Sequence, residues 1–167
     1  MIPVIVLTHG NLASELVQAA QTIDPNLVET SAMSLPWDVD SDEASRSLKK
    51  QLRELDQGEG MLILTDMFGG TATNLALPFL QPEKVEVVTG VNLPMLVKLG
   101  SLQGRSLSLE ELAAGITAAG QKSIRLASEF LHARASSRRG QRYQPASRYN
   151  RQADRKVGHA APRGFEE

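Results

Sequence analysis

Short aliphatic runs without charge alternate with amphipathic segments over about residues 1–131, and this alternation restricts the possible folds more than any other feature. Residues 4–7 and 61–65 have the composition of strands that are buried on both faces of a parallel sheet. Residues 27–33 and 84–89 are predicted to form two further strands. Because helical patterns separate these runs, we predict an α/β fold of right-handed βαβ units: a single doubly wound, mostly parallel open sheet flanked by helices on both faces.

Amphipathic patterns and helix-ending residues delimit the predicted helices. They cover about residues 11–23, 38–56, 72–80, 95–102 and the stretch from 108 onward. In the first helix, the apolar side chains at helical spacing are Leu12, Leu16, Ala19, Ala20 and Ile23. Ser108 and Glu111 form a capping-box pattern at the start of the last helix, whose predicted apolar face extends to Ala127. Each helix therefore has an apolar face with which to cover the sheet.

Charge is distributed unevenly along the 167 residues. Residues 1–131 carry 9 Lys or Arg and 16 Asp or Glu, whereas residues 132–167 carry 9 and 3. We therefore predict an acidic domain over 1–131 and a basic tail over 132–167. The tail has too few apolar residues to offset the entropy of ordering, so we expect it to be disordered and solvated. Binding of the tail to nucleic acid or to an anionic membrane is a weaker alternative.

Several classes of protein are excluded or disfavoured by composition. The chain has no cysteine, which excludes disulfides, thiolate metal sites and cysteine catalysis. The N-terminus enters a strand directly, without a basic region or cleavage site, and no apolar run is long enough to span a membrane. These features predict a cytoplasmic protein.

Two loops are predicted to meet at the edge of the sheet where ligands usually bind in open α/β folds. Thr8-His9-Gly10 ends the first strand, and residues 66–74 follow the third. A histidine at this edge can expose one neutral ring nitrogen as a nucleophile, because imidazole titrates at about pH 6.5. Asp66 could accept a hydrogen bond from the other ring nitrogen, as the carboxylate does in hydrolase triads. We therefore predict that His9 accepts a phosphoryl group.

The second loop also offers groups that could bind the phosphoryl oxygens. Gly69 and Gly70 allow backbone amides to turn inward, while Thr71 offers a hydroxyl and is expected to cap the next helix. The chain has neither a Walker A loop nor a GxGxxG motif, so no nucleotide, other cofactor or metal is expected, and the predicted phosphate donor is another protein. Simpler interpretations remain open for each residue: a core histidine, an Asp66 that caps its own loop, and an ordinary Gly-Gly turn.

Three motifs, in order, resemble those of one protein family. They are Ile-Val-Leu-Thr-His-Gly at 5–10, Leu-Thr-Asp-Met-Phe-Gly-Gly-Thr at 64–71 and Val-Thr-Gly-Val-Asn-Leu-Pro-Met-Leu at 88–96. Over about residues 1–131 the chain resembles the mannose-type IIA component of the bacterial phosphoenolpyruvate:sugar phosphotransferase system. The resemblance implies a homodimeric phosphotransferase with a phosphohistidine intermediate. It would be phosphorylated by HPr and would pass the phosphoryl group to a IIB component during sugar uptake. The resemblance implies a cytoplasmic location, with peripheral association with the membrane permease as a further option.

The resemblance also implies roles for particular residues. His9 would carry phosphate on Nε2, Asp66 would bind its other nitrogen, and Thr71 would touch the phosphoryl group. The predicted phosphoryl-binding loop consists of Gly10, Phe68, Gly69 and Gly70. The predicted rim residues near the site are Trp37, Asn92 and Pro94. For Trp37, in the loop after the second strand, the simplest expectation is a residue that covers the core, with a partner surface as the alternative.

The sequence departs from the family pattern in two respects. Ala72 stands where proline is common, which loosens the loop without removing a chemical group. The basic tail is too short for a IIB domain, so we expect the IIB partner to be a separate chain. Two further functions stay open: a regulatory IIA protein that senses phosphorylation state, and a phosphodonor subunit for dihydroxyacetone kinase.

Overall fold

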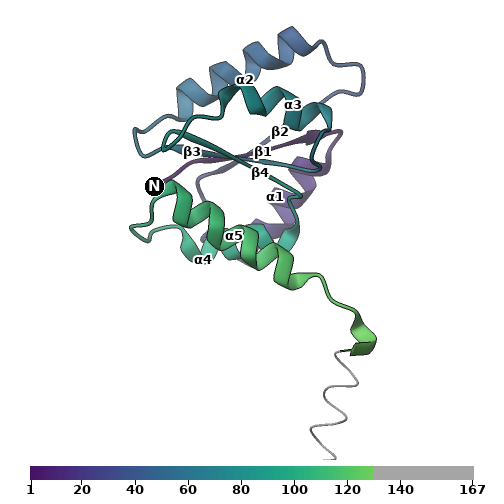
Figure 1. The fold of residues 1–167 in the computed structure, drawn as a ribbon, viewed down its shortest axis with the longest axis vertical. Coiled ribbons are helices and arrows are strands. Elements are labelled where there is room, and N and C mark those ends of the chain that lie inside the picture. Colours follow the sequence, from purple (N-terminus) through teal and green to yellow (C-terminus); the bar gives the residue numbers. More distant parts are fainter. Residues whose placement is uncertain (130–167) are drawn as a thin grey trace, which may run out of the picture. The chain divides into compact units, whose positions relative to one another are not determined.

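A computed structural model describes residues 1–129 (Figure 1). These residues include a compact unit from Met1 to Arg125 and the first residues of a second unit that begins at Leu126. The predicted tail, 132–167, lies outside the described residues, so its disorder and the proposed domain boundary stay predictions. None of the helices within residues 1–129 is long and apolar enough to cross a membrane.

Four parallel strands form one open sheet in the order β2-β1-β3-β4. The strands are β1 (Val4–His9), β2 (Thr30–Leu35), β3 (Met61–Thr65) and β4 (Val85–Thr89). His9 pairs with Leu35, Leu7 with Thr65, and Thr65 with Thr89, so all four strands end at the same edge of the sheet. The prediction of a doubly wound parallel α/β fold is confirmed.

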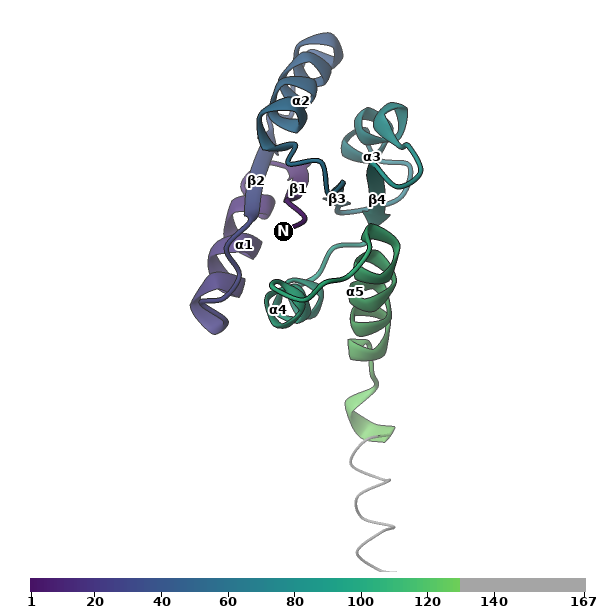
Figure 2. The same cartoon turned by 90° about the vertical axis from the view of Figure 1, so that its left-hand side faces the viewer.

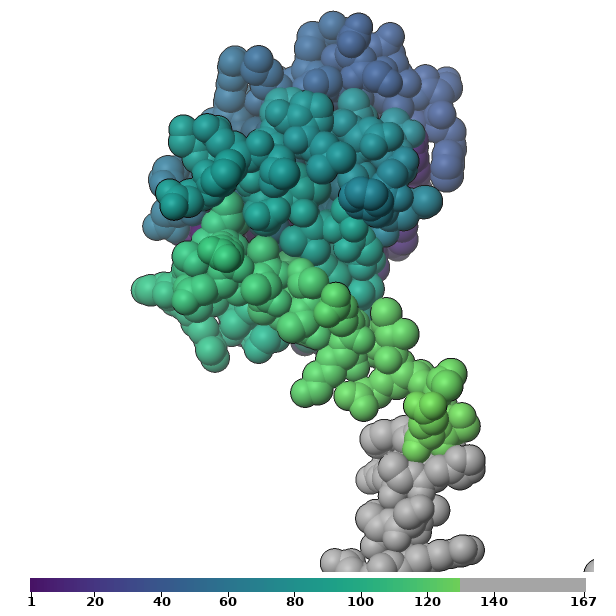
Figure 3. Space-filling view, viewed as in Figure 1, coloured from purple at the N-terminus to yellow at the C-terminus, as the bar shows by residue number. Residues whose placement is uncertain are grey.

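Helices cover both faces of the sheet (Figure 2). The helices are α1 (Leu12–Ile23), α2 (Ser41–Leu55), α3 (Thr71–Ala76), α4 (Leu93–Leu102) and α5 (Leu109–Ser123), with a 3-10 turn, η1 (Leu77–Phe79), after α3. Helices α1, α4 and α5 pack on one face, against Val4, Val6 and Leu64. Helices α2 and α3 pack on the other, against Ile5 and Leu7. In the space-filling view the atoms of α2 (blue) lie at the top of the compact unit and those of α5 (green) lie at its bottom (Figure 3).

The second strand begins three residues later than the sequence pattern suggested. Leu27 is only 2% exposed, but it lies in the loop before β2, whose pairing begins at Val4–Thr30. The apolar character of Leu27 suggested a strand, but an apolar residue can be buried without pairing to a neighbouring strand. The shift places Ser34 and Leu35 inside β2 instead of in the loop that follows it.

The buried face of α1 also differs from the predicted one. Ala13, Val17 and Ala20 face the core, whereas Leu12 and Ile23 are 45% and 58% exposed. The prediction is confirmed for Ala20 and in part for Leu16, which packs partly buried against the core, and it is wrong for Leu12, Ala19 and Ile23. The small side chains of Ala13 and Ala20 allow the helix to lie close to the sheet.

The remaining differences concern helix ends. Helix α3 ends at Ala76 and not near 80, because Pro78 in η1 cannot continue it. Helix α4 begins earlier than predicted, at Leu93, and α5 has the predicted capping box of Ser108 and Glu111. Helix α5 ends at Ser123, so Ala127 is not part of its apolar face.

Candidate functional site

His9 is the last residue of β1, an interior strand, and it is held by the elements on either side of it. The Gly10 N–H donates to the Leu35 carbonyl at 2.9 Å, which ties the turn after His9 to the end of β2. The Thr8 hydroxyl is fully buried and accepts from the Ala13 N–H at 2.8 Å, which ties the same turn to the start of α1. The turn at His9 is thus hydrogen-bonded to both neighbouring elements, and the His9 side chain is half-buried.

The imidazole of His9 has one buried nitrogen and one covered face. Its Nδ1 atom is buried and has no hydrogen-bond partner among the described residues. The indole of Trp37 stacks on the ring, with centroids 5.0 Å apart and planes inclined by 4°. Because Trp37 is 83% exposed, the expectation that it covers the core is wrong. Its ring instead packs against the histidine from the loop after β2.

Gly10 lies beneath this stack and has a backbone that favours glycine. Its φ is +56°, a conformation that other residues adopt at a cost. A Cβ added there would lie 3.7 Å from Trp37 Nε1, so the turn passes directly against the indole. A side chain at this distance would make only ordinary van der Waals contact, so the positive φ, and not lack of space, favours glycine next to His9.

Asp66 follows β3 directly and is half-buried. Its Oδ1 accepts from the Met67 N–H at 2.8 Å, which is the local capping role that the sequence left open. The residues described here contain no hydrogen bond between Asp66 and His9, so that pairing stays a prediction. A carboxylate has two acceptor oxygens, and the local bond leaves Oδ2 available.

Two buried threonines, which the sequence analysis missed, anchor the loop after β3. The Thr73 hydroxyl donates to the Met67 carbonyl at 2.6 Å and lies 2.7 Å from the Thr65 hydroxyl. A hydroxyl has one proton, so Thr65 must be the donor to Thr73. Both side chains are fully buried. The available signal for Thr65 was its position at the end of an uncharged strand, and the sequence held no such signal for Thr73.

The glycine turn before α3 is built differently from the prediction. Gly69 has φ +79°, and Gly70 occupies the N-cap position of α3, where no side chain accepts a hydrogen bond. Thr71 is the first residue of the helix and is exposed, so the expectation that it caps α3 is wrong. Beside this turn, Met67 and Phe68 are 61% and 77% exposed. The loop therefore presents apolar side chains and a free hydroxyl to solvent.

The loop after β4 reaches the same edge of the sheet. The Val91 N–H donates to the Thr65 carbonyl at 2.9 Å, and this bond attaches the loop to the end of β3. Asn92 is the N-cap of α4 and accepts from the Met95 N–H at 3.2 Å, while Pro94 is exposed in the first turn. Asn92 thus has a structural role in this arrangement, next to the predicted site.

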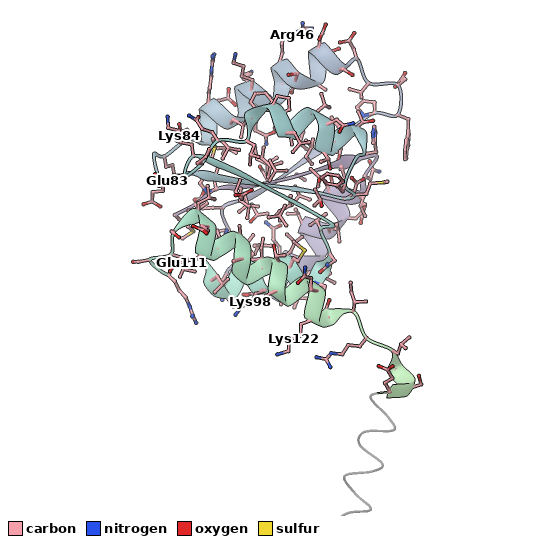
Figure 4. The ribbon with its side chains drawn as sticks, viewed as in Figure 1. Arg46, Glu83, Lys84, Lys98, Glu111 and Lys122 are labelled. Carbon is pink, nitrogen blue, oxygen red and sulfur yellow. The ribbon has the colours of Figure 1, made fainter. Side chains whose placement is uncertain are left out.

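The charged side chains labelled in Figure 4 come from the loop before β4 and from helices α2, α4 and α5. Glu83 and Lys84 precede β4, at the opposite edge of the sheet, and Arg46 and Lys122 lie on the outer helices. Within residues 1–129, no group of three His, Asp or Glu side chains could hold a metal ion.

The fold and the site define a class of protein: a parallel α/β domain with a stacked, half-buried histidine at the carboxyl end of an interior strand. A model of the family described as PTS system fructose IIA component (EIIA-man) matches residues 3–117, and the chain belongs to this family. The predicted resemblance to mannose-type IIA components is thereby confirmed.

Curated relatives agree with this assignment. The chain is 29% identical over 136 residues to the fructose-specific EIIA component of Bacillus subtilis, an alignment that covers 78% of this chain and 90% of that protein. It is 30% identical over 128 residues to the mannose-specific EIIAB component of Escherichia coli K12, covering 74% of this chain but only 39% of that longer protein.

Solved structures show the same fold. A mannose/sorbose-specific IIA subunit from Enterococcus faecalis is 28% identical, with a TM-score of 0.67 and coverage of 75% of this chain and 95% of that one. A PTS IIA protein associated with a fucose utilization operon of Streptococcus pneumoniae is 31% identical, with a TM-score of 0.66 and coverage of 77% and 95%.

Proposed function

We propose that the chain is a phosphocarrier of sugar uptake, which accepts a phosphoryl group on His9 from HPr and passes it to a IIB component. Membership of the IIA family supports a role in the sugar phosphotransferase system. The observation that carries the residue assignment is the geometry of His9, which lies at the carboxyl end of an interior strand with Nδ1 buried. Burial of Nδ1 favours Nε2 as the reacting atom.

The reaction consists of two transfers: the phosphoryl group moves from HPr to His9, and then from His9 to the IIB component. The Nε2 lone pair attacks the phosphorus of the donor phosphohistidine, so a new P–N bond forms as the P–N bond of HPr breaks. The proton stays on Nδ1, and after rotation of the Asp66 side chain Oδ2 would accept a hydrogen bond from this N–H. In the second transfer the Nε2–P bond breaks as a nucleophile of the IIB component bonds to phosphorus, and His9 returns to its neutral form. Gly69, Gly70 and Thr71 supply amides and a hydroxyl for the phosphoryl oxygens, since this chemistry depends mainly on positioning and charge stabilisation.

The surface at this edge suits a protein as donor and acceptor. Trp37, Met67 and Phe68 are large apolar side chains with exposures of 83%, 61% and 77%. Exposed aromatic and methionine side chains are typical of protein interfaces. Both transfers would take place in the cytoplasm, and an encounter with IIB could bring the chain to the membrane permease.

The decisive experiment is phosphorylation by phosphoenolpyruvate, enzyme I and HPr. Wild type should become labelled and should transfer the label to a IIB protein, whereas His9→Ala should not be labelled. The other two histidines, His132 and His159, provide matched controls, and their alanine variants should label normally. A label that survives in His9→Ala would contradict the assignment.

We propose a homodimer as the working assembly. β4 is an edge strand of the described sheet, with four of its five residues only partly buried. An unpaired strand edge is a surface on which a strand of another chain can pair. Light scattering should then give twice the 18.1 kDa of one chain, and a monomer at micromolar concentration would refute the dimer. The family assignment favours sugar transport over the regulatory and dihydroxyacetone kinase alternatives.

A further inference from the structure

We propose that Trp37 is a positioning residue for His9, which holds the plane of the imidazole and stabilises the ring when phosphorylation makes it cationic. The inference deepens the proposed function and rests on it. The observation that carries it is the nearly parallel stack of the two rings, 5.0 Å apart at an angle of 4°.

The contact is built from both sides. On the side of Trp37, the Val39 N–H donates to the Pro36 carbonyl at 3.3 Å and closes a turn around the tryptophan. On the side of His9, Gly10 adopts φ +56° and passes beneath the indole without a side chain. Core packing does not account for Trp37, because 83% of it is exposed. The ring's position is therefore explained by its contact with the imidazole.

The stack restrains the histidine without blocking it. The lone pair of Nε2 lies in the plane of the imidazole, and a phosphoryl group must arrive and leave along that direction. A ring that lies parallel to this plane covers a face and leaves the edge open. The indole therefore limits rotation of the imidazole about its Cβ–Cγ bond while the path of transfer remains free.

The stack also has an electrostatic consequence. With phosphate on Nε2 and a proton on Nδ1, the imidazole ring carries a positive charge. The face of an indole attracts such a cation more strongly than the face of phenylalanine or an aliphatic side chain does. For a partly exposed pair this attraction corresponds to about a two- to fivefold shift of an equilibrium constant. Trp37 should therefore favour the phosphorylated form of His9 by about this factor.

The test compares Trp37→Ala, Trp37→Leu and Trp37→Phe with wild type. The measured quantities are the equilibrium between phosphorylated HPr and the chain, and the rate at which the phosphohistidine hydrolyses. Ala and Leu should lower the equilibrium constant about two- to fivefold and accelerate hydrolysis, whereas Phe should restore part of the loss. Val28→Ala is a matched control, since Val28 is 59% exposed and lies before β2, whereas Trp37 lies after it. Equal behaviour of all variants, or full rescue by Leu, would overturn the inference.

A second measurement separates this inference from the proposed function. Trp37 is the only tryptophan of the chain, so its fluorescence reports on the stack in the unphosphorylated protein. His9→Ala should change that emission, and Trp37→Ala should shift the imidazole resonances of His9. If wild type is not labelled on His9, the proposed function fails. If wild type is labelled but the emission does not respond to His9→Ala, the inference alone fails.

Discussion

Removing the Thr73 hydroxyl tests how the loop after β3 is held in place. Thr73→Val keeps the volume and branching of the side chain but abolishes its bonds to the Met67 carbonyl at 2.6 Å and to the Thr65 hydroxyl at 2.7 Å. The Thr65 hydroxyl, which is fully buried, is then left without a partner. The variant therefore removes one buried attachment of residues 66–70 without creating a cavity.

The magnitude follows from these two bonds. A net hydrogen bond contributes about 1 kcal/mol, and a buried polar group left unsatisfied costs about 1 to 3 kcal/mol. We expect Thr73→Val to lower the free energy of unfolding by about 2 to 3 kcal/mol. The melting temperature should then fall by roughly 5 to 10 °C. Phosphorylation of His9 should also slow, because the loop that contains Asp66 loses its attachment.

Urea unfolding and labelling kinetics measure the two effects. Thr65→Val and the double variant complete a cycle, and the double variant should lose less than the sum of the single losses, because it leaves no orphaned hydroxyl. Thr22→Val is the control, since its exposed hydroxyl donates to Gln18 on the surface of α1, and we expect a change below about 0.5 kcal/mol. A Thr73→Val protein as stable as this control, or strictly additive losses, would refute the reasoning.

Two further predictions concern the residues beside His9. Asp66→Asn should slow phosphoryl transfer roughly a hundredfold, because an amide cannot supply the negative charge that favours a proton on Nδ1. The transfer rate is measured for this variant and for the exposed control Asp38→Asn. An unchanged rate in Asp66→Asn would exclude Asp66 from the reaction. Gly10→Ala should lower stability by about 1 kcal/mol through its positive φ. It should also slow transfer, because a backbone shift that relieves this strain occurs next to His9. Gly104→Ala is the control, since Gly104 has φ +84° with open space around it. Urea unfolding should show a similar loss of stability for Gly104→Ala, and its transfer rate should not change. Equal transfer rates in the two variants would contradict the role given to the Gly10 turn.

Local pattern was sufficient for the architecture. Uncharged runs such as Met61–Thr65 are distinctive because a strand that is buried on both faces excludes charge, and that strand was predicted with its observed ends. Parallel strands have their carboxyl ends at one edge, so the sequence also placed the His9 and Asp66 loops on the same edge of the sheet. The capping box of α5 was readable because its two hydrogen bonds join residues only three apart.

Tertiary contacts decided the rest. The ends of β2 depend on its pairing with β1, and that pairing sets where the loop with Trp37 begins. Which face of α1 is buried depends on how closely the helix approaches the sheet. The stack on His9 and the Thr65–Thr73 hydrogen bond join residues that are separate in the sequence. Periodicity and composition describe each segment's own preference, whereas these contacts depend on the distances and angles between segments, which exist only once the sheet and its helices have packed.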